Sequence, residues 1–151
     1  MKKARYILIA AIIFIDQLVK CIVRKEMFAG ESIPIIDGIF HLTYVKNTGA
    51  AFNMFEGASA FLFIVPLIAI IAAAWYMEKN INEHGSLTAA LVLIISGGAG
   101  NIIDRATKGF VTDMFDFRVF PVFNVADIAI CVGAFLLIVY IFRFESGEKK
   151  L

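Results

Sequence analysis

Four long apolar runs occupy most of this 151-residue sequence, at residues 6–23, 60–77, 87–103 and 125–142. Each run is near the roughly 17 to 25 residues that an α-helix needs to span the hydrocarbon core of a bilayer. Hydrophobic residues make up 60% of the chain and charged residues 18%, which is more apolar than a soluble globular domain. The sequence therefore predicts an all-α integral membrane protein, with residues 1–151 forming a single membrane domain of four transmembrane helices.

The first apolar run begins like a secretory signal peptide, with basic residues ahead of an apolar centre. Asp16 and Lys20 lie within the apolar stretch, however, and no cleavage site of small residues follows it. We therefore expect this helix to be retained.

Basic residues are divided almost evenly between the two sides of the four helices, but a cluster at residues 2–5 favours a cytoplasmic N-terminus. An even number of spans then returns the C-terminus to the cytoplasm. Residues 24–59 and 104–124 are the segments expected outside. The net charge of +1 gives no basic surface for nucleic acid.

The first external segment carries the signal of a tight β-hairpin. Asp37-Gly38 lies between two extended-looking runs in SIPIIDGIFHLTYV, and Phe40, Leu42 and Tyr44 alternate along the second run. This pattern predicts a small extracytoplasmic β-hairpin or sheet between the first and second helices. The second external segment contains the Phe-rich sequence GFVTDMFDFRVFPVF, residues 109–123, which predicts an extended interfacial stretch.

Two Asn-x-x-Asp pairs face the same predicted membrane boundary. Asn101 and Asp104 end the third helix, where the helix dipole disfavours an acid, so Asp104 needs a partner and the adjacent Arg105 is a candidate. Asn124 and Asp127 begin the fourth helix, where Asn124 can be the N-cap and the dipole favours an acid in the first turn. The second pair thus has a purely structural alternative.

Asp16 and Lys20 lie one turn apart on the first helix, roughly 10 Å and 5 Å from its outer end at about 1.5 Å per residue. They can neutralise each other as a helical pair, but ionisable groups inside membrane spans are costly and more often functional. Asp113 and Asp116, in the second external segment, would by themselves most often be solvated loop acids.

Several chemistries are disfavoured. The only two histidines, His41 and His84, are expected on opposite sides, and no H-E-x-x-H motif occurs, so we expect neither a metal site nor a cofactor. A Ser–Lys pair, such as Ser96 with Lys20, stays open as an alternative.

Carboxylates near the outer boundary are abundant, and two carboxylates in one site can divide general acid and general base roles around a water. The residues alone therefore favour aspartic hydrolysis, with Asp104 and Asp127 as the pair. A small carrier is the alternative from another class. A carrier places its ionisable groups near the midplane, whereas these lie at or beyond the outer edge.

Five motifs in order along the chain resemble those of the bacterial lipoprotein signal peptidases, also called signal peptidase II. They are DQLVK in the first helix, NTGAAF at 47–52, GGAGNIIDR at 97–105, GFVTDMFDF at 109–117 and FNVADIAI at 123–130. The resemblance implies a four-helix aspartyl endopeptidase of the cytoplasmic membrane, without a metal. Such an enzyme removes the signal peptide from diacylglyceryl-modified prolipoproteins by cutting before the lipidated Cys.

The resemblance also assigns residues. It implies that Asp113 and Asp127 are catalytic, in place of the Asp104 favoured by the residues alone. Substrate-binding or supporting roles are implied for Asp16, Lys20, Asn47, Asn101, Asp104, Arg105 and Asn124. Thr112 is a departure, because an apolar residue commonly precedes the first catalytic Asp. We expect a monomer that contacts lipid-modified prolipoproteins and membrane lipids, with its active site near the outer face.

Overall fold

The computed structural model describes residues 2–49, 59–80 and 84–145. The elements are α1 (Lys2–Glu26), β1 (Ser32–Ile36), β2 (Phe40–Asn47), α2 (Ser59–Lys79), α3 (Gly85–Lys108), β3 (Val111–Asp116), α4 (Val125–Tyr140) and a final π-helical turn, η2 (Ile141–Glu145). In the described part of the chain, four helices are long and apolar enough to cross a membrane. The predicted integral membrane fold with four spanning helices is confirmed.

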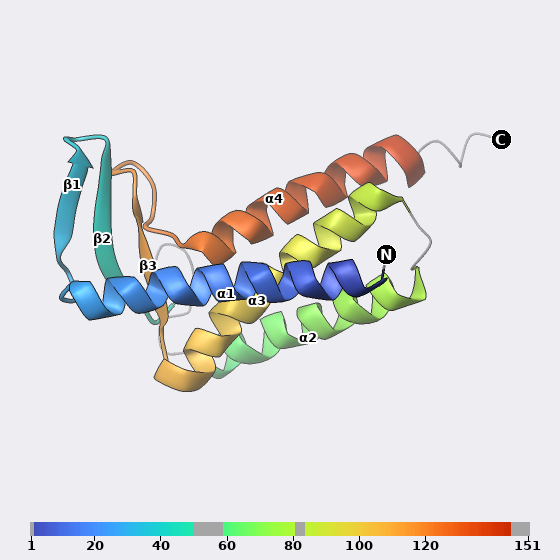
Figure 1. Ribbon diagram of the computed structural model, residues 1–151, viewed down its shortest axis with the longest axis horizontal. Helices are drawn as coiled ribbons and strands as arrows, with labels where there is room; N and C mark the ends of the chain where they lie inside the picture. The colour runs from blue at the N-terminus through green and yellow to red at the C-terminus, as the bar shows by residue number, and fades with distance from the viewer. Residues whose placement is uncertain (1, 50–58, 81–83, 146–151) are drawn as a thin grey trace.

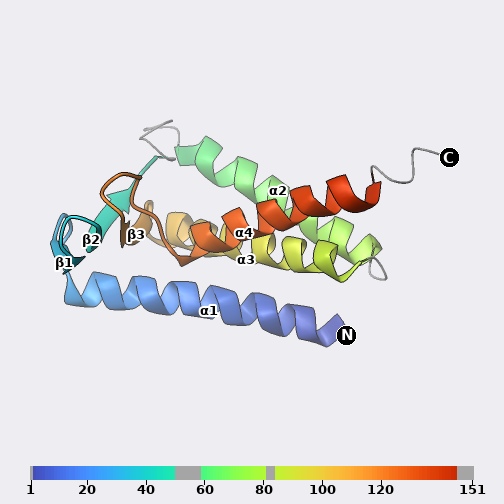
Figure 2. The ribbon, with the colours of Figure 1, turned by 90° about the horizontal axis from the view of Figure 1, so that it is seen from above.

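The four helices form an elongated bundle, and the strands lie beyond one end of it (Figures 1 and 2). The beginning of α1 and the end of α4 are both at the opposite end of the bundle (Figures 1 and 2). Helix α3 is central, because it packs against α1, α2 and α4. Half of its most apolar window is buried inside the protein, against 22% or less for each of the other three helices.

Small residues let the neighbouring helices approach α3 closely. A Cβ added at Gly97 would collide with the backbone carbonyl of Ala126 in α4, and one at Gly100 would lie 2.5 Å from Oδ2 of Asp16 in α1. Close approach of backbones at Gly is a common packing device between membrane helices. At Gly100 it also leaves room for a charged side chain between α1 and α3.

The three strands form one antiparallel sheet in the order β1-β2-β3. The predicted hairpin is confirmed, with Gly38 at a φ of 70° in the turn between β1 and β2. The Phe-rich segment expected to be merely extended supplies the third strand, in which Asp113 is paired with Val45 of β2. The sheet thus joins chain segments from both sides of α2 and α3.

A small core fixes the sheet against the end of α1. Val23 of α1 and Met27, which directly follows α1, pack with Tyr44 of β2 and Met114 of β3, and all four side chains are buried. Gly109 ends α3 in the left-handed conformation, with a φ of 79° and an N–H bond to the carbonyl of Arg105. The chain then turns directly into β3, which places Asp113 next to the end of α3.

Candidate active site

The two aspartates implied as catalytic line the same cleft. Asp113 lies in β3 with only 2% of its surface exposed, and Asp127 lies in the first turn of α4. The cleft has a volume of about 850 Å³, and Asn47, Asn101 and Arg105 also line it. The fold therefore brings together side chains from β2, β3, α3 and α4 that are far apart in the sequence.

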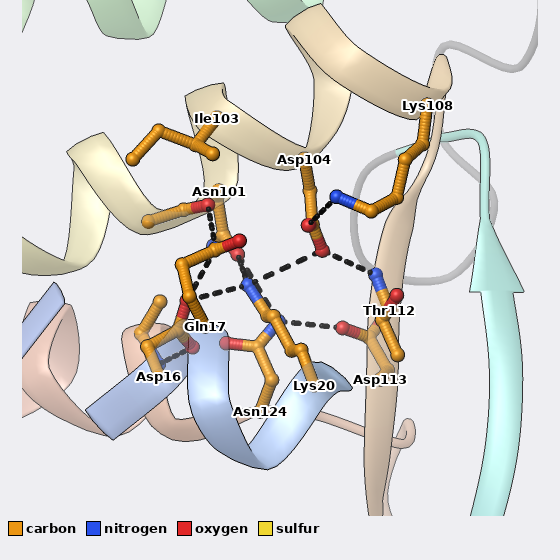
Figure 3. A network of polar contacts seen from close by, with 12 residues as sticks. Asp16, Gln17, Lys20, Asn101, Ile103, Asp104, Lys108, Thr112, Asp113 and Asn124 are labelled. Carbon is orange, nitrogen blue, oxygen red and sulfur yellow. Dashed lines mark hydrogen bonds and ion pairs between the residues drawn. The ribbon is translucent and has the colours of Figure 1, made fainter. Parts of the chain in front are cut away.

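Two buried amides link the aspartates. Nδ2 of Asn124 donates to Oδ1 of Asp113 at 2.6 Å and to Oδ1 of Asn101 at 3.1 Å (Figure 3). Nδ2 of Asn101 in turn donates to Oδ1 of Asp127 at 2.8 Å. Each carboxylate thus receives a neutral donor, so the network positions the aspartates without adding a positive charge directly to either one.

Asn124 and Asp127 also form a capping box at the start of α4. The N–H of Asp127 donates to Oδ1 of Asn124 at 2.9 Å, and the N–H of Asn124 donates to Oδ2 of Asp127 at 3.1 Å. The structural alternative for this pair is present, but it does not exclude a catalytic role, because Asp127 still lines the cleft. The cap turns Nδ2 of Asn124 toward Asp113.

Asn47 holds the other oxygen of Asp113. Its Nδ2 donates to Oδ2 of Asp113 at 2.9 Å, while its Oδ1 accepts the N–H of Gly49 at 3.0 Å. The turn after β2 thus orients the amide toward the carboxylate. Residues 50–52 of the NTGAAF motif lie outside the described part of the chain.

A fully buried lysine lies behind Asn101. Nζ of Lys20 is 2.8 Å from Oδ1 of Asn101 and 2.9 Å from Oδ2 of Asp16, so the predicted helical pair is present. Because the lysine occupies the oxygen side of the Asn101 amide, the nitrogen side faces Asp127. The second oxygen of Asp16 accepts the N–H of Ala126 at 2.9 Å, which ties α1 to the first turn of α4.

The predicted ion pair between Asp104 and Arg105 is wrong. The Asp104 carboxylate is fully buried and lies 2.9 Å from Nζ of Lys108, 3.4 Å from Arg24 and 3.6 Å from Lys20. It also accepts the N–H of Thr112 at 3.0 Å. Adjacent residues on a helix point in different directions, and Arg105 donates instead to the carbonyl of Gly49 at 3.2 Å.

Residues 8–143 match the profile of peptidase family A8, described as "Signal peptidase (SPase) II". The chain belongs to the signal peptidase II family. The lipoprotein signal peptidase of Halothermothrix orenii is 44% identical over 141 residues, covering 93% of this chain and 97% of the relative. That of Bacillus subtilis is 38% identical over 149 residues, covering 96% of each.

Solved structures agree with this membership. A bacterial membrane enzyme determined by the in meso method at 2.3 Å resolution matches with a TM-score of 0.90 and 29% identity, covering 99% of this chain and 93% of that one. A second, at 1.9 Å resolution, matches with a TM-score of 0.85, the same identity and 94% of each chain covered. The family identified from the five sequence motifs is therefore confirmed, and its members are aspartic peptidases.

The pKa of the Asp113 carboxyl bears on the catalytic role that the resemblance implies for it. Burial raises the pKa of this carboxyl to about 7, the N–H groups of Asn47 and Asn124 act against the rise, and the negative charge of Asp127 adds to it. At neutral pH the group can therefore both hold and release a proton. This is the property expected of a general acid or base.

The Ser–Lys alternative finds no support in the contacts of the two side chains. Ser96 donates to the carbonyl of Val92 one turn back, and Lys20 is taken up by Asn101 and Asp16. Metal-free catalysis stays a prediction. Within residues 2–49, 59–80 and 84–145, no group of three or more His, Cys, Asp and Glu side chains is placed to hold a metal ion.

Sequence reasoning missed two residues that support the site. Arg24 donates to the hydroxyl of Thr112 at 2.9 Å, beside its contact with Asp104. Arg24 continues the helical spacing of Asp16 and Lys20, so this face of α1 was visible in the sequence. Thr112 was noted only as a departure from the family pattern, and its hydroxyl fastens β3 immediately before Asp113.

Proposed function

We propose that the protein is an endopeptidase that removes signal peptides from diacylglyceryl-modified prolipoproteins, cutting immediately before the lipidated Cys. Asp113 and Asp127 are its catalytic pair. The observation that carries the proposal is that these two carboxylates line one cleft, each oriented by amides that the fold holds in place.

The reaction needs a water molecule between the two carboxylates, of which one is ionised and the other protonated. The ionised aspartate takes a proton from the water, and the oxygen of that water attacks the scissile carbonyl carbon. The protonated aspartate first donates a hydrogen bond to the developing oxyanion and keeps its proton. It then transfers that proton to the leaving amine as the C–N bond breaks, while the other aspartate holds the proton taken from the water. Because the two groups titrate as a coupled pair, the proton belongs to the pair rather than to one residue.

The geometry of Asp104 supports the choice of Asp113 as the partner of Asp127. Asp104 is fully buried among three cations and a backbone N–H. It is also absent from the described residues that line the cleft. A carboxylate in that position compensates the three cations and is buried away from the cleft, so its role is to hold β3 against α1 and α3.

We place the cleft on the extracytoplasmic side of a bacterial cytoplasmic membrane, with both termini cytoplasmic. The basic residues before the first apolar run support this orientation. The beginning of α1 and the end of α4 lie at the end of the bundle opposite the sheet (Figure 1). The cleft lies at the sheet end rather than near the bundle's middle, which also argues against a carrier.

The substrate's signal helix then lies in the membrane beside α4, and its lipidated Cys reaches the boundary beside the sheet. Arg105 lines the cleft and can donate to the extended backbone of the substrate. Asn47 and Asn101 orient the catalytic carboxylates. We propose a monomer that needs membrane lipid and substrate, but no cofactor.

The test is incubation of the purified protein in detergent with a diacylglyceryl-modified prolipoprotein, followed by mass spectrometry of the products. The proposal predicts release of the intact signal peptide and a product that begins at the lipidated Cys. The control is the same precursor without its diacylglyceryl group, which should be cut much more slowly. Cleavage at another bond, or equal cleavage of both precursors, would contradict the proposed specificity.

A further inference from the structure

The loop that joins β3 to α4, residues 117–123, presents large apolar side chains to the outside. Val119 is 94% exposed and Phe120 is 61% exposed. Both side chains also line the cleft that contains Asp113 and Asp127. On the side of the loop, the wall of this polar site is therefore mainly apolar, with Arg118 as the charged residue among those that line it.

The position of the 117–123 loop is built into the fold. Asp116 is buried and accepts from the N–H of Arg118 at 2.8 Å, from its guanidinium at 2.9 Å and from the hydroxyl of Thr43 at 2.8 Å. Arg118 has a φ of 66°, which is uncommon outside glycine. The expectation that Asp116 is a solvated loop acid is therefore wrong. Its buried carboxylate fixes the first residues of the loop through these hydrogen bonds.

Aromatic packing fixes the other end of the loop. The rings of Phe117 and Phe123 are stacked, with centroids 5.9 Å apart and planes inclined by 4°. Phe120 meets Phe123 edge to face at 6.2 Å. Because both ends are held, the exposed side chain of Val119 stands at the rim of the cleft.

The position of the loop relative to the membrane indicates what it contacts. Helix α4 begins at Val125, two residues after the loop, so the loop lies at the proposed membrane boundary. In the proposed reaction, the diacylglyceryl group is attached to the residue that follows the scissile bond. When the scissile bond lies between Asp113 and Asp127, the glycerol and the first carbons of the acyl chains must therefore lie close to the cleft.

We propose that Val119 and Phe120 form the binding surface for the acyl chains of the substrate next to the glycerol, and that this contact selects lipidated precursors. The inference rests on the proposed function and names the part of the cleft that recognises the lipid. Burial of these two side chains against acyl chains supplies binding free energy that an unmodified Cys cannot provide.

The alternative is that the loop only anchors the protein in the membrane. Phe28 and Ile39 serve as matched controls, because they are 85% and 59% exposed and are not among the cleft-lining residues in the described part of the chain. The double variant V119S/F120S is compared with F28S/I39S. V119L/F120L, which keeps the surface apolar, tests for rescue.

Each protein is assayed for kcat/KM in one detergent on two prolipoprotein substrates, one dipalmitoylglyceryl-modified and one dibutyrylglyceryl-modified. Thermal unfolding is measured in parallel to confirm that the variants are folded. The wild type should prefer the long-chain substrate. V119S/F120S should lose about tenfold on that substrate, mainly through KM, and little on the short-chain one, while F28S/I39S and V119L/F120L keep the preference.

An unchanged chain-length preference in folded V119S/F120S would overturn the inference. Equal losses in V119S/F120S and F28S/I39S would overturn it in favour of membrane anchoring. If V119S/F120S does not fold, the single variant V119S, at the more exposed of the two positions, is assayed in its place. An unchanged chain-length preference in V119S would then overturn the inference. If the wild type cleaves neither substrate, the proposed function fails, and the inference falls with it.

Discussion

Replacing Asp104 by Asn tests whether this carboxylate is structural. Its side chain is fully buried and contacts Lys20, Arg24 and Lys108, and it accepts the N–H of Thr112. Asn keeps the shape of the side chain, and its oxygen can still accept from Thr112. The substitution therefore removes mainly the negative charge that compensates three cations.

The expected loss of stability follows from those contacts. A buried ion pair broken on one side costs about 3–5 kcal/mol. Lys20 keeps its 2.9 Å contact with Asp16. Arg24 and Lys108 are partly exposed and can be hydrated again. We therefore expect a smaller loss, of about 2–3 kcal/mol, which corresponds to a fall in Tm on the order of 5–10 °C.

The assay compares melting and turnover of purified variants in one detergent. Asp104→Asn should melt earlier, and adding Lys108→Gln should recover part of the loss, because this cation is 2.9 Å from the missing charge. Arg105→Gln should give no such recovery, because Arg105 bonds to Gly49 instead. Asp113→Asn should be inactive without a loss of stability.

One result would refute this reasoning. If Asp104→Asn is fully stable and inactive while Asp113→Asn is active, then Asp104, and not Asp113, is the partner of Asp127. The pair favoured by the residues alone would then be correct.

Three further predictions concern protonation, a serine and metal ions. The pKa of Asp113 is about 7 in the folded protein against an ordinary 3.8, so the unfolded chain releases this proton first, and stability should fall by up to about 4 kcal/mol as pH rises from about 4 to about 7. When Tm is measured at a series of pH values, the stability of Asp113→Asn should fall less steeply with pH than that of the wild type. Equal slopes for the two proteins would contradict the raised pKa of Asp113. Ser96→Ala should cleave prolipoprotein at the wild-type rate; an inactive but folded variant would revive the Ser–Lys alternative. EDTA should leave cleavage unchanged, whereas loss with recovery on added zinc would show a metal requirement.

The parts of the fold that depend on local pattern could be predicted from the sequence. The length of each apolar run defined the four spans, and Asp37-Gly38 marked the hairpin. The contact between Asp16 and Lys20 followed from helical spacing alone. In each case, the residues that decide the structure lie within one element or one turn.

Contacts between distant segments could not be predicted in the same way. The pairing of β3 with β2 joins Asp113 to Val45 across two helices, and no local signal specifies it. Burial of Asp113 follows from that pairing, so the residues alone preferred Asp104. One partner of Asp104 was missed for the same reason, since Arg24 lies 80 residues away in the sequence. Its other partner Lys108 lies four residues on in the same helix, so that contact was within reach of helical spacing.

Cleavage of a diacylglyceryl-modified prolipoprotein by wild type, Asp113→Asn and Asp127→Asn is the most direct test of the central claim. An amide keeps the size of the carboxyl group but cannot exchange the proton. The account predicts signal-peptide release by the wild type and none by either variant, although both variants stay folded in the same detergent. Turnover near the wild-type rate by either folded variant would remove that aspartate from the catalytic pair.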